Sequence, residues 1–365
     1  MFRQAQLNRV KLQTVFKRLA SFVPVEFNTS LKQHGSRING RKFLPGSSHK
    51  DMPEFLSYRH NPNLKAVHFK GDKSKVATAV REYIDANLQS SSAILFKGLP
   101  IENEHDFNRI VKGTGFKMMP YVGGIASRDT LVDKVYEASN EPKEISIDLH
   151  NEMSYVKWFP KKIMFCCITP SAIDGETPIC FNRELLRELD PIFVKKVDEK
   201  KIRYIRNYGT RENSDYMSWQ SIFETDSKEC AEEVLKSLNS EWKWHSDGTL
   251  TSWHIGDAFI THPETNEKIW FNQIPAMHNS FYFNHPDFYD QPELKTEELP
   301  FHMTYGDGEE MELGFIQQHR IAQWKLAVGI QWEKGDLIVL DDLLVQHGRM
   351  SYQGARKLVV GLIDE

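Results

Sequence analysis

Ile147-Asp148-Leu149-His150-Asn151-Glu152 is the stretch around which the rest of this chain is organised, together with Val345-Gln346-His347-Gly348-Arg349 near the other end. His150 and Glu152 stand two positions apart, and His347 follows far downstream. Two histidines and one carboxylate can bind one face of an octahedral metal ion and leave the opposite positions open. Because the chain contains 14 histidines, this spacing arises easily by chance, so its value depends on the sequence around it.

Short apolar segments separated by turn residues recur along the chain after His150. They lie at residues 162–169, 242–245, 268–272, 326–331, 337–340 and 358–362. Helices alternate with these strands in few places, which disfavours a parallel sheet with crossover helices. Short strands between turn signals instead favour an antiparallel sandwich or jelly roll. The sequence therefore predicts a mainly β fold with flanking helices.

Apolar residues at helical spacing predict those flanking helices. The segments are 75–88, 104–111, 183–189, 192–197 and 230–238. Glycines and prolines scattered among polar residues between positions 30 and 62 predict an extended segment, so we expect an N-terminal extension or arm at 1–62. Residues 63–365 are then expected to form one jelly-roll domain with an insertion around 273–310.

The first 25 residues contain five basic residues and no acidic residue. This composition is typical of an organelle transit peptide, and a basic helix packed on the domain is an equal alternative. The four cysteines show neither the spacing of a disulfide framework nor a Cys-x-x-Cys motif. Reduced thiols predict an intracellular, cytoplasmic protein, with import into an organelle as the alternative.

Charge and hydropathy narrow the range of partners. The net charge of −4 and the pI of about 6.4 give no reason to expect nucleic acid or an anionic membrane surface as a partner. No apolar stretch reaches the 18 or so residues that a membrane-spanning helix requires. A chain of 365 residues can bury a large core around a small-molecule site.

Two histidines and one carboxylate form the facial triad of non-haem Fe(II) oxygenases, in which the open positions take a cosubstrate and then O2. If the cosubstrate is 2-oxoglutarate, its distal carboxylate requires a cation, commonly an arginine in bidentate geometry. Arg356 follows His347 by nine residues, at the start of the last apolar strand. The sequence therefore offers each part of such a site in the expected order.

Several sequence blocks carry a family resemblance. They are Leu149-His150-Asn151-Glu152-Met153, Gly175-Glu176-Thr177-Pro178, Trp270-Phe271-Asn272-Gln273, Tyr305-Gly306-Asp307-Gly308 and a last set at 335–357, with Pro120-Tyr121-Val122-Gly123-Gly124 before them. Over roughly residues 75–365 the chain resembles the taurine dioxygenase and clavaminate synthase-like family of Fe(II)/2-oxoglutarate-dependent oxygenases. The resemblance implies a double-stranded β-helix, or jelly-roll, core.

By this resemblance His150, Glu152 and His347 are the catalytic iron ligands. Thr177 resembles the residue whose hydroxyl helps to hold 2-oxoglutarate. Arg356 resembles the cationic partner of its distal carboxylate. Lys357 is the alternative partner, because successive residues of a strand face opposite sides and only one of the two can face the cavity.

The resemblance implies that Fe(II), 2-oxoglutarate and O2 together oxidise an unactivated C–H bond and release succinate and CO2. Hydroxylation is the expected outcome. Oxidative ring closure or desaturation in secondary metabolism, of the clavaminate or kainoid type, is the alternative.

Loops expected near the metal contain polar and aromatic residues suited to an amino-acid-like or carboxylated metabolite. The candidate substrate-binding residues are Tyr121, Arg128, Tyr155, His278 and Arg349, with Asn279 beside them. Arg349 has two interpretations: it pairs with a substrate carboxylate, or it pairs with the turn formed by Asp341 and Asp342.

Two hypotheses from other classes compete with the oxygenase. A zinc hydrolase would use the same two histidines and glutamate without O2, and it leaves Thr177 and Arg356 unexplained. A silent jelly-roll scaffold that binds a partner would tolerate loss of the triad, yet the triad is present in order. The oxygenase is the hypothesis that accounts for all these residues.

Overall fold

The computed structural model describes residues 21–25, 37–38, 45–57, 61–121, 124, 128–213, 218–285 and 295–365. The basic segment at 1–25 falls almost wholly outside the described residues. Of the N-terminal extension, the described parts include the short strand β1 (Phe22–Pro24), which pairs with β2 (Leu64–Phe69). In the described part of the chain no helix is long and apolar enough to cross a lipid bilayer.

Two sheets form the jelly-roll core, as the sequence predicted. The larger sheet has the order β1, β2, β3 (Ala93–Lys97), β17 (Leu337–Asp341), β7 (Lys162–Thr169), β20 (Lys357–Ile363), β5 (Val135–Glu137) and β4 (Thr130–Val132). The smaller sheet has the order β16 (Val328–Ile330), β9 (Thr177–Phe181), β18 (Val345–Arg349) and β6 (Ile147–His150). All pairings within them are antiparallel except that of β2 with β3. Two-stranded ribbons pair β8 (Ile173–Asp174) with β19 (Tyr352–Gln353) and β13 (Phe259–Thr261) with β14 (Lys268–Trp270).

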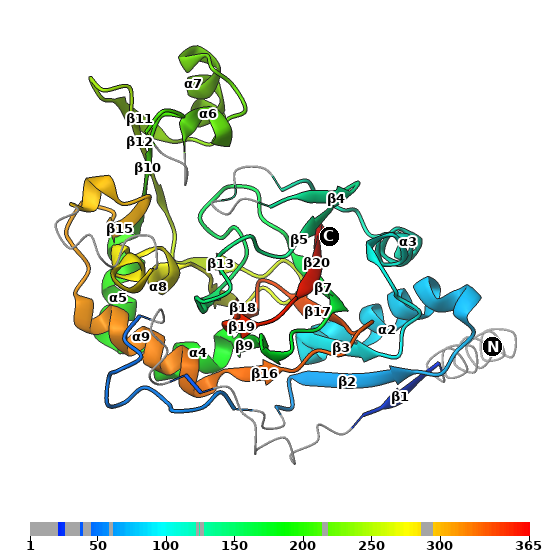
Figure 1. Ribbon diagram of the computed structural model, residues 1–365. Coiled ribbons are helices and arrows are strands. Elements are labelled where there is room, and N and C mark those ends of the chain that lie inside the picture. Colours follow the sequence, from blue (N-terminus) through cyan, green and yellow to red (C-terminus); the bar gives the residue numbers. More distant parts are fainter. Residues whose placement is uncertain are drawn as a thin grey trace, which may run out of the picture.

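The hydrophobic core lies between these two sheets. Phe165 and Ile338 of the larger sheet pack in one cluster with Ile179 and Val345 of the smaller sheet. The opposite face of the larger sheet is covered by α2 (Val76–Ser91) and α3 (Glu104–Thr114), which follow the short helix η2 (Lys73–Lys75) (Figure 1). Because both faces of this sheet are buried, its strands are continuously apolar rather than alternating.

The smaller sheet is backed by helices that the sequence analysis predicted only in part. α4 (Asn182–Glu188) and α5 (Pro191–Lys200) match predicted segments, and α9 (Leu313–Leu326) does not. α9 packs on β6 and β9. The sequence analysis placed a strand at 326–331, whereas the strand β16 there is only three residues long and starts after α9 ends.

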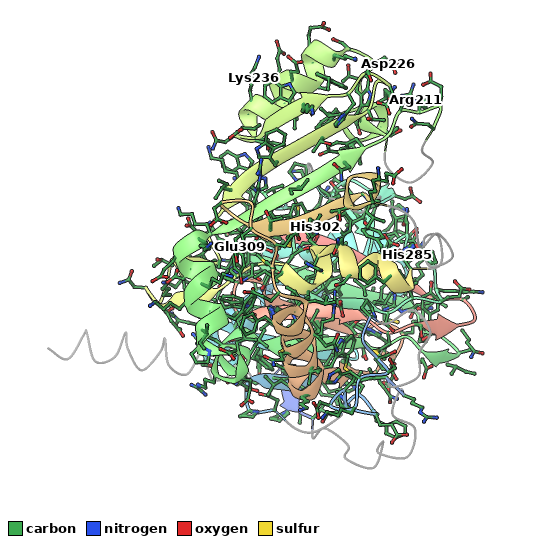
Figure 2. The ribbon with its side chains drawn as sticks, turned by 90° about the vertical axis from the view of Figure 1, so that its left-hand side faces the viewer. Arg211, Asp226, Lys236, His285, His302 and Glu309 are labelled. Atoms are coloured by element: carbon green, nitrogen blue, oxygen red, sulfur yellow. The ribbon has the colours of Figure 1, made fainter. Side chains whose placement is uncertain are left out.

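A further four-stranded sheet, here called the accessory sheet, stands out from the jelly roll (Figure 1). Its order is β11 (Glu241–Trp244), β12 (Leu250–Gly256), β10 (Ile202–Tyr208) and β15 (Phe301–Tyr305). α6 (Trp219–Ile222) and α7 (Lys228–Ser237) pack at its outer end, which Arg211, Asp226 and Lys236 mark in Figure 2. The expected insertion at 273–310 contains α8 (Ile274–Met277), η3 (Asn279–Asn284), η4 (Thr296–Glu298) and β15. Only β15 of these joins the accessory sheet, and the other three strands of the sheet come from residues 202–256.

Candidate active site

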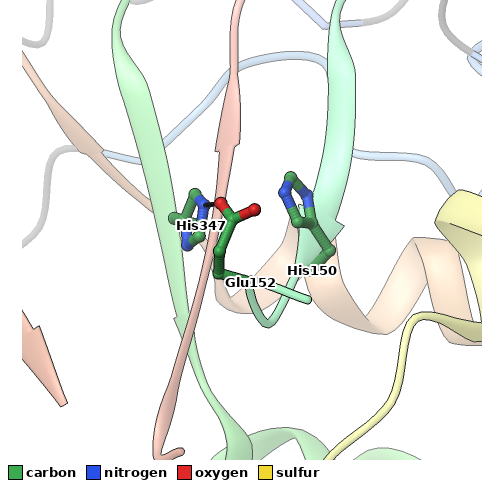
Figure 3. Close-up of side chains that lie close together, drawn as sticks. All are labelled: His150, Glu152 and His347. Atoms are coloured by element: carbon green, nitrogen blue, oxygen red, sulfur yellow. Dashed lines mark ion pairs between the residues drawn. The ribbon is translucent and has the colours of Figure 1, made fainter. Parts of the chain in front are cut away.

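The pairing of β6 with β18 brings two of the predicted metal ligands together. His150, the last residue of β6, is the direct partner of His347 on β18, and their ring centroids lie 4.6 Å apart. Glu152 follows in the turn after β6, and its Oε2 lies 3.5 Å from Nε2 of His347. One ligand atom from each of the three residues lies within 4.8 Å of the others. Figure 3 shows the three side chains directed toward one another. The three side chains therefore converge on one point.

Hydrogen bonds orient these ligands for a metal ion. Nδ1 of His150 lies 2.8 Å from the carbonyl of Asp148, so it carries the proton and leaves the lone pair of Nε2 free. Nδ1 of His347 faces Oδ1 of Asp342 at 3.6 Å, and the amide of Glu152 donates to the same oxygen at 3.2 Å. His150, held at Nδ1 by a carbonyl oxygen, therefore presents Nε2 to a metal, as metal-binding histidines do. Nδ1 of His347 has no hydrogen-bond partner among the described residues, and Asp342 is the carboxyl group nearest to it.

The protonation states also fit a divalent cation. Burial and the neighbouring His347 lower the pKa of His150 to about 4. Burial alone would raise the pKa of Glu152, but the guanidinium of Arg128 and the contact with His347 lower it below its usual value. At neutral pH the site therefore presents a neutral imidazole at His150 and a carboxylate, the forms that ligate metals.

Helix α9 fixes the strands that carry the ligands. Arg320 donates from Nε to Oδ2 of Asp148 at 2.9 Å, and both side chains are fully buried. Gln323 donates from Nε2 to the carbonyl of Leu149 on β6 at 2.9 Å and to Oε1 of Gln346 on β18 at 2.7 Å. Sequence reasoning missed these supporting residues, although Asp148 lies inside the stretch that it singled out.

The triad opens onto a cavity of about 940 Å³. The predicted site residues that line it are His150, Glu152, His347, Thr177, Arg356, Tyr121, Arg128, Tyr155 and Arg349. Its walls also include aromatic residues that the sequence analysis did not select, such as Phe281 and Phe301. Phe301 lies on β15, a strand that was not predicted.

Of the two adjacent basic residues near the C-terminus, Arg356 faces the cavity. Its Nε donates to the carbonyl of Gly175 at 3.1 Å, and its guanidinium lies 5.3 Å from the ring centre of Tyr352. Burial and the neighbouring Arg349 lower the pKa of Arg356 to about 10, so the side chain remains cationic at neutral pH. Lys357 points to the other side of the sheet, where Nζ lies 3.0 Å from Oε2 of Glu104 on α3.

Thr177, the first residue of β9, lies in the wall of the same cavity and is 3% exposed. Its Oγ1 accepts a hydrogen bond from Nε1 of Trp332 at 3.0 Å. The hydroxyl accepts in that bond and keeps its own proton, which it can donate to an anionic oxygen. The pair Thr177 and Arg356 thus offers a hydroxyl donor and a cation for a carboxylate.

Arg128 lies beside the triad. Its Nη2 donates to Oε2 of Glu152 at 2.7 Å, and its guanidinium carbon lies 4.6 Å from the ring centre of Tyr121. The side chain is only 5% exposed, yet Nε and Nη1 have no hydrogen-bond partner among the described residues. A buried cation with two N–H groups left over is suited to a ligand carboxylate.

Arg349 lines the cavity, and it does not pair with the turn formed by Asp341 and Asp342. Its Nη1 donates to the carbonyl of Glu141 at 2.9 Å, and its Nη2 donates to the carbonyls of Pro142 and Ile145. These bonds fix the segment before β6. Because main-chain carbonyls have no side-chain signature, these partners could not be found from sequence.

His278 does not line the cavity. It packs against His302, which lies on β15 of the accessory sheet and is labelled in Figure 2, and Glu310 lies beside them. These three residues are close enough for a metal, but Nδ1 of His278 accepts from the amide of Ser280 at 3.2 Å and Nδ1 of His302 from that of Asn279 at 3.4 Å. In this arrangement each ring carries its proton on Nε2, and Nε2 of His302 lies 2.8 Å from Oε2 of Glu310, so both rings already have partners within the protein.

Comparison with known proteins identifies relatives over most of the chain. The model of the taurine catabolism dioxygenase TauD, TfdA family matches residues 57–362. A clavaminate synthase-like protein of Arabidopsis thaliana is 30% identical over 291 residues, which are 77% of this chain and 84% of that protein. The dapdiamide synthesis protein DdaC of Enterobacter agglomerans is 30% identical over 281 residues, with the same two shares.

Solved structures are more distant. PvcB of Pseudomonas aeruginosa is 13% identical, with a TM-score of 0.48, over 90% of this chain and 95% of that one. A taurine dioxygenase of Burkholderia xenovorans is 14% identical, with a TM-score of 0.47, over 85% and 89%. Likeness at this level bears on neither reaction nor substrate.

Proposed function

The chain belongs to the taurine catabolism dioxygenase TauD, TfdA family, whose members depend on Fe(II) and 2-oxoglutarate, and from this premise we propose that it hydroxylates a small carboxylated, amino-acid-like metabolite. Family membership makes it an oxidoreductase that uses O2. When bound, Fe(II), 2-oxoglutarate and O2 supply the oxidation of an unactivated C–H bond, with 2-oxoglutarate converted to succinate and CO2 and one oxygen atom left in the product.

The convergence of these side chains, of which Glu152 and His347 are buried and His150 is half-buried, supports His150, Glu152 and His347 as the iron ligands. The positions of Thr177 and Arg356 in the cavity wall support them as the residues that hold the distal carboxylate of 2-oxoglutarate. A zinc hydrolase would leave this cation and hydroxyl without a role.

The proposed substrate class is inferred from the surroundings of Arg128. Its Nε and Nη1 have no partner among the described residues, and the side chain lies between the triad and Tyr121. Glu152 has two oxygens, so its carboxylate can ligate the metal with one and accept from Arg128 with the other. A substrate carboxylate on the remaining N–H groups would lie close to the metal, which directs the oxidation to carbon atoms near that carboxylate.

The rest of the cavity fits a carbon skeleton. Phe165, Phe281 and Phe301 line it, and such walls exclude water from the oxidising centre. The names of two relatives, the clavaminate synthase-like protein and the dapdiamide synthesis protein, also favour a small biosynthetic molecule over a macromolecule as the substrate.

The test is turnover with Fe(II), 2-oxoglutarate and O2 against a panel of amino acids, N-acyl amino acids and their carboxamides. Succinate formation above the substrate-free rate identifies a substrate. A product heavier by one oxygen atom shows hydroxylation, and one lighter by two hydrogen atoms shows ring closure or desaturation.

Arg128→Gln tests the carboxylate anchor within the same panel. We expect it to raise the KM of the carboxylated substrate at least about tenfold and to leave the KM of its carboxamide nearly unchanged. Lys357→Met, outside the cavity, is the matched control. Equal effects of Arg128→Gln on both substrates would overturn the anchor role, because damage to Glu152 alone does not distinguish them.

A further inference from the structure

One face of the accessory sheet is turned toward the active-site cavity. Arg206 on β10 lies directly opposite Phe301 on β15 and Ser252 on β12. Residues directly opposite one another in an antiparallel sheet project from the same face. Since Phe301 lines the active-site cavity, Arg206 and Ser252 lie on the face that adjoins it.

A second, smaller cavity lies under this face, and we call it the side chamber. It comprises about 340 Å³, part of which is open to solvent, against about 940 Å³ for the active-site cavity, and its lining includes Tyr204, Arg206, Tyr208, Ser252 and His254 together with Tyr155. Tyr155 lines both cavities, so it lies between them. A chamber of this size suits one functional group of a metabolite rather than a second metabolite.

The side chamber presents one cation and several hydrogen-bond donors. Arg206 is 5% exposed, and its guanidinium lies 5.2 Å from the ring centre of Tyr208 and 6.0 Å from that of Tyr155. Its Nη2 donates to the carbonyl of Gly124 at 3.3 Å, which ties it to the loop between Tyr121 and Arg128. The described residues that line the chamber include no carboxylate.

The buried hydroxyl of Tyr204 indicates that the side chamber binds a ligand. This hydroxyl is buried, with the residue 1% exposed, and it has no hydrogen-bond partner among the described residues. Burial raises the pKa of Tyr204, so the phenol keeps its proton and is a donor. Burial and the neighbouring Arg206 lower the pKa of His254 to about 4, so its ring, stacked on Tyr204, is neutral at pH 7. A buried donor left without a partner is costly unless a ligand or water meets it.

We propose that the side chamber binds a second carboxylate at the far end of an elongated substrate, on Arg206 and Tyr204, while Arg128 holds the carboxylate near the metal. This rests on the proposed function and narrows its substrate class to dicarboxylates. The side chain of Tyr155 must turn aside for the two ends to be bound at once. The accessory sheet is therefore the part of the fold that selects the length and the charge of the substrate.

The experiment uses the full chain with Fe(II) and saturating 2-oxoglutarate under anaerobic conditions. The probes are adipate, pimelate and suberate, each compared with its monoamide, which retains one carboxylate for Arg128. The readout is the dissociation constant obtained from the shift of the Fe(II)–2-oxoglutarate charge-transfer band. Loss of the band would mean displacement of 2-oxoglutarate, and a shifted band means binding beside it.

For one chain length we expect the diacid to bind about tenfold more tightly than its monoamide, as a hydrogen bond to a charged group implies. Arg206→Gln should reduce that preference to less than about threefold, and Tyr204→Phe should reduce it in part. Arg203→Gln is the matched control, because Arg203 lies on the same strand, its guanidinium 4.9 Å from the ring centre of Trp253.

A preference that survives both Arg206→Gln and Tyr204→Phe would overturn the side-chamber proposal. The proposal would also be overturned if, at every chain length, the monoamide bound as tightly as the diacid and its binding depended on Arg128. In that case the proposed function would stand without a second carboxylate site. Failure of every mono- and diacid to shift the band would remove both proposals together. If Arg206→Gln does not fold, as judged by circular dichroism, Tyr204→Phe still decides.

Discussion

His150 and His347 are direct partners across the antiparallel pair β6 and β18, with ring centroids 4.6 Å apart. The strand pairing itself therefore brings together two proposed metal ligands that are far apart in the sequence. Side chains alternate between faces along a strand, so a slip of one residue in this register would turn one imidazole away from the other. The register of two strands is thus part of the chemistry of the site.

The first prediction concerns metal and cosubstrate binding. Anaerobic addition of Fe(II) and 2-oxoglutarate should produce the weak visible charge-transfer band of a chelated keto acid. His347→Ala should abolish it, because two remaining ligands do not complete the facial triad. His105→Ala, at an exposed position on α3, is the matched control. A full band in folded His347→Ala protein would contradict the assignment of this ligand.

The second prediction separates Arg356 from Lys357. Arg356→Gln should weaken 2-oxoglutarate binding at least about tenfold, because a buried cation that meets a carboxylate is lost. Lys357→Met should change it less than about twofold, because this side chain pairs with Glu104 on the outer face of the sheet. Titration of the charge-transfer band with 2-oxoglutarate measures both. The reverse order of effects would transfer the role to Lys357.

The third prediction concerns the helix behind the triad. Arg320→Met should lower the free energy of unfolding by about 3–5 kcal/mol, because Asp148 is left as an uncompensated buried charge. It should also weaken Fe(II) binding, because Asp148 adjoins Leu149 and His150 on β6. Adding Asp148→Asn should restore part of the stability, since the charge is removed. Urea unfolding of the two single variants and the double variant gives a double-mutant cycle for Arg320 and Asp148. If the losses in the free energy of unfolding were strictly additive, the two side chains would not be energetically coupled.

The fold class and the site residues that line the cavity were accessible from sequence for a physical reason. The strands of the larger sheet are buried on both faces and are therefore apolar throughout, as in Lys162–Thr169. The proposed ligands lie on β6, directly after it and on β18, and each belongs to a short block of sequence. Such local patterns can be recognised in the sequence without knowledge of the tertiary structure.

Of the accessory sheet only β11 was predicted, at 242–245; β10, β12, β15 and the helix α9 were missed because their apolar residues do not follow a regular period. On β10 the inward face carries the charged Arg206, whereas the apolar Ile205 faces outward, so the alternation of a half-buried strand is broken. α9 buries polar residues such as Arg320 and Gln323 as well as apolar ones, so it has no single apolar stripe. His278 was wrongly expected at the cavity for the same reason, because it packs against His302 on β15, a strand that was not predicted.

The last prediction is a pH dependence of stability from His319 on α9. This side chain is 1% exposed, between the rings of Trp270 and Phe193, and neither ring nitrogen has a partner among the described residues. Burial and the neighbouring Arg320 lower its pKa to about 3. The folded protein therefore keeps His319 neutral at pH values where the unfolded chain, with a pKa near 6.5, binds a proton.

The sign follows from this difference. As the pH falls below about 6.5, the unfolded state gains a proton that the folded state does not, so stability falls by up to about 1.4 kcal/mol per pH unit from this group. His319→Leu should raise the free energy of unfolding at pH 7 by about 1 kcal/mol, because two unsatisfied nitrogens leave the core. It should also reduce the slope of stability against pH between 6.5 and 4.5, measured by urea unfolding. Exposed His105→Leu should leave the slope unchanged, and an equally steep slope in His319→Leu would show that His319 is not the group that titrates.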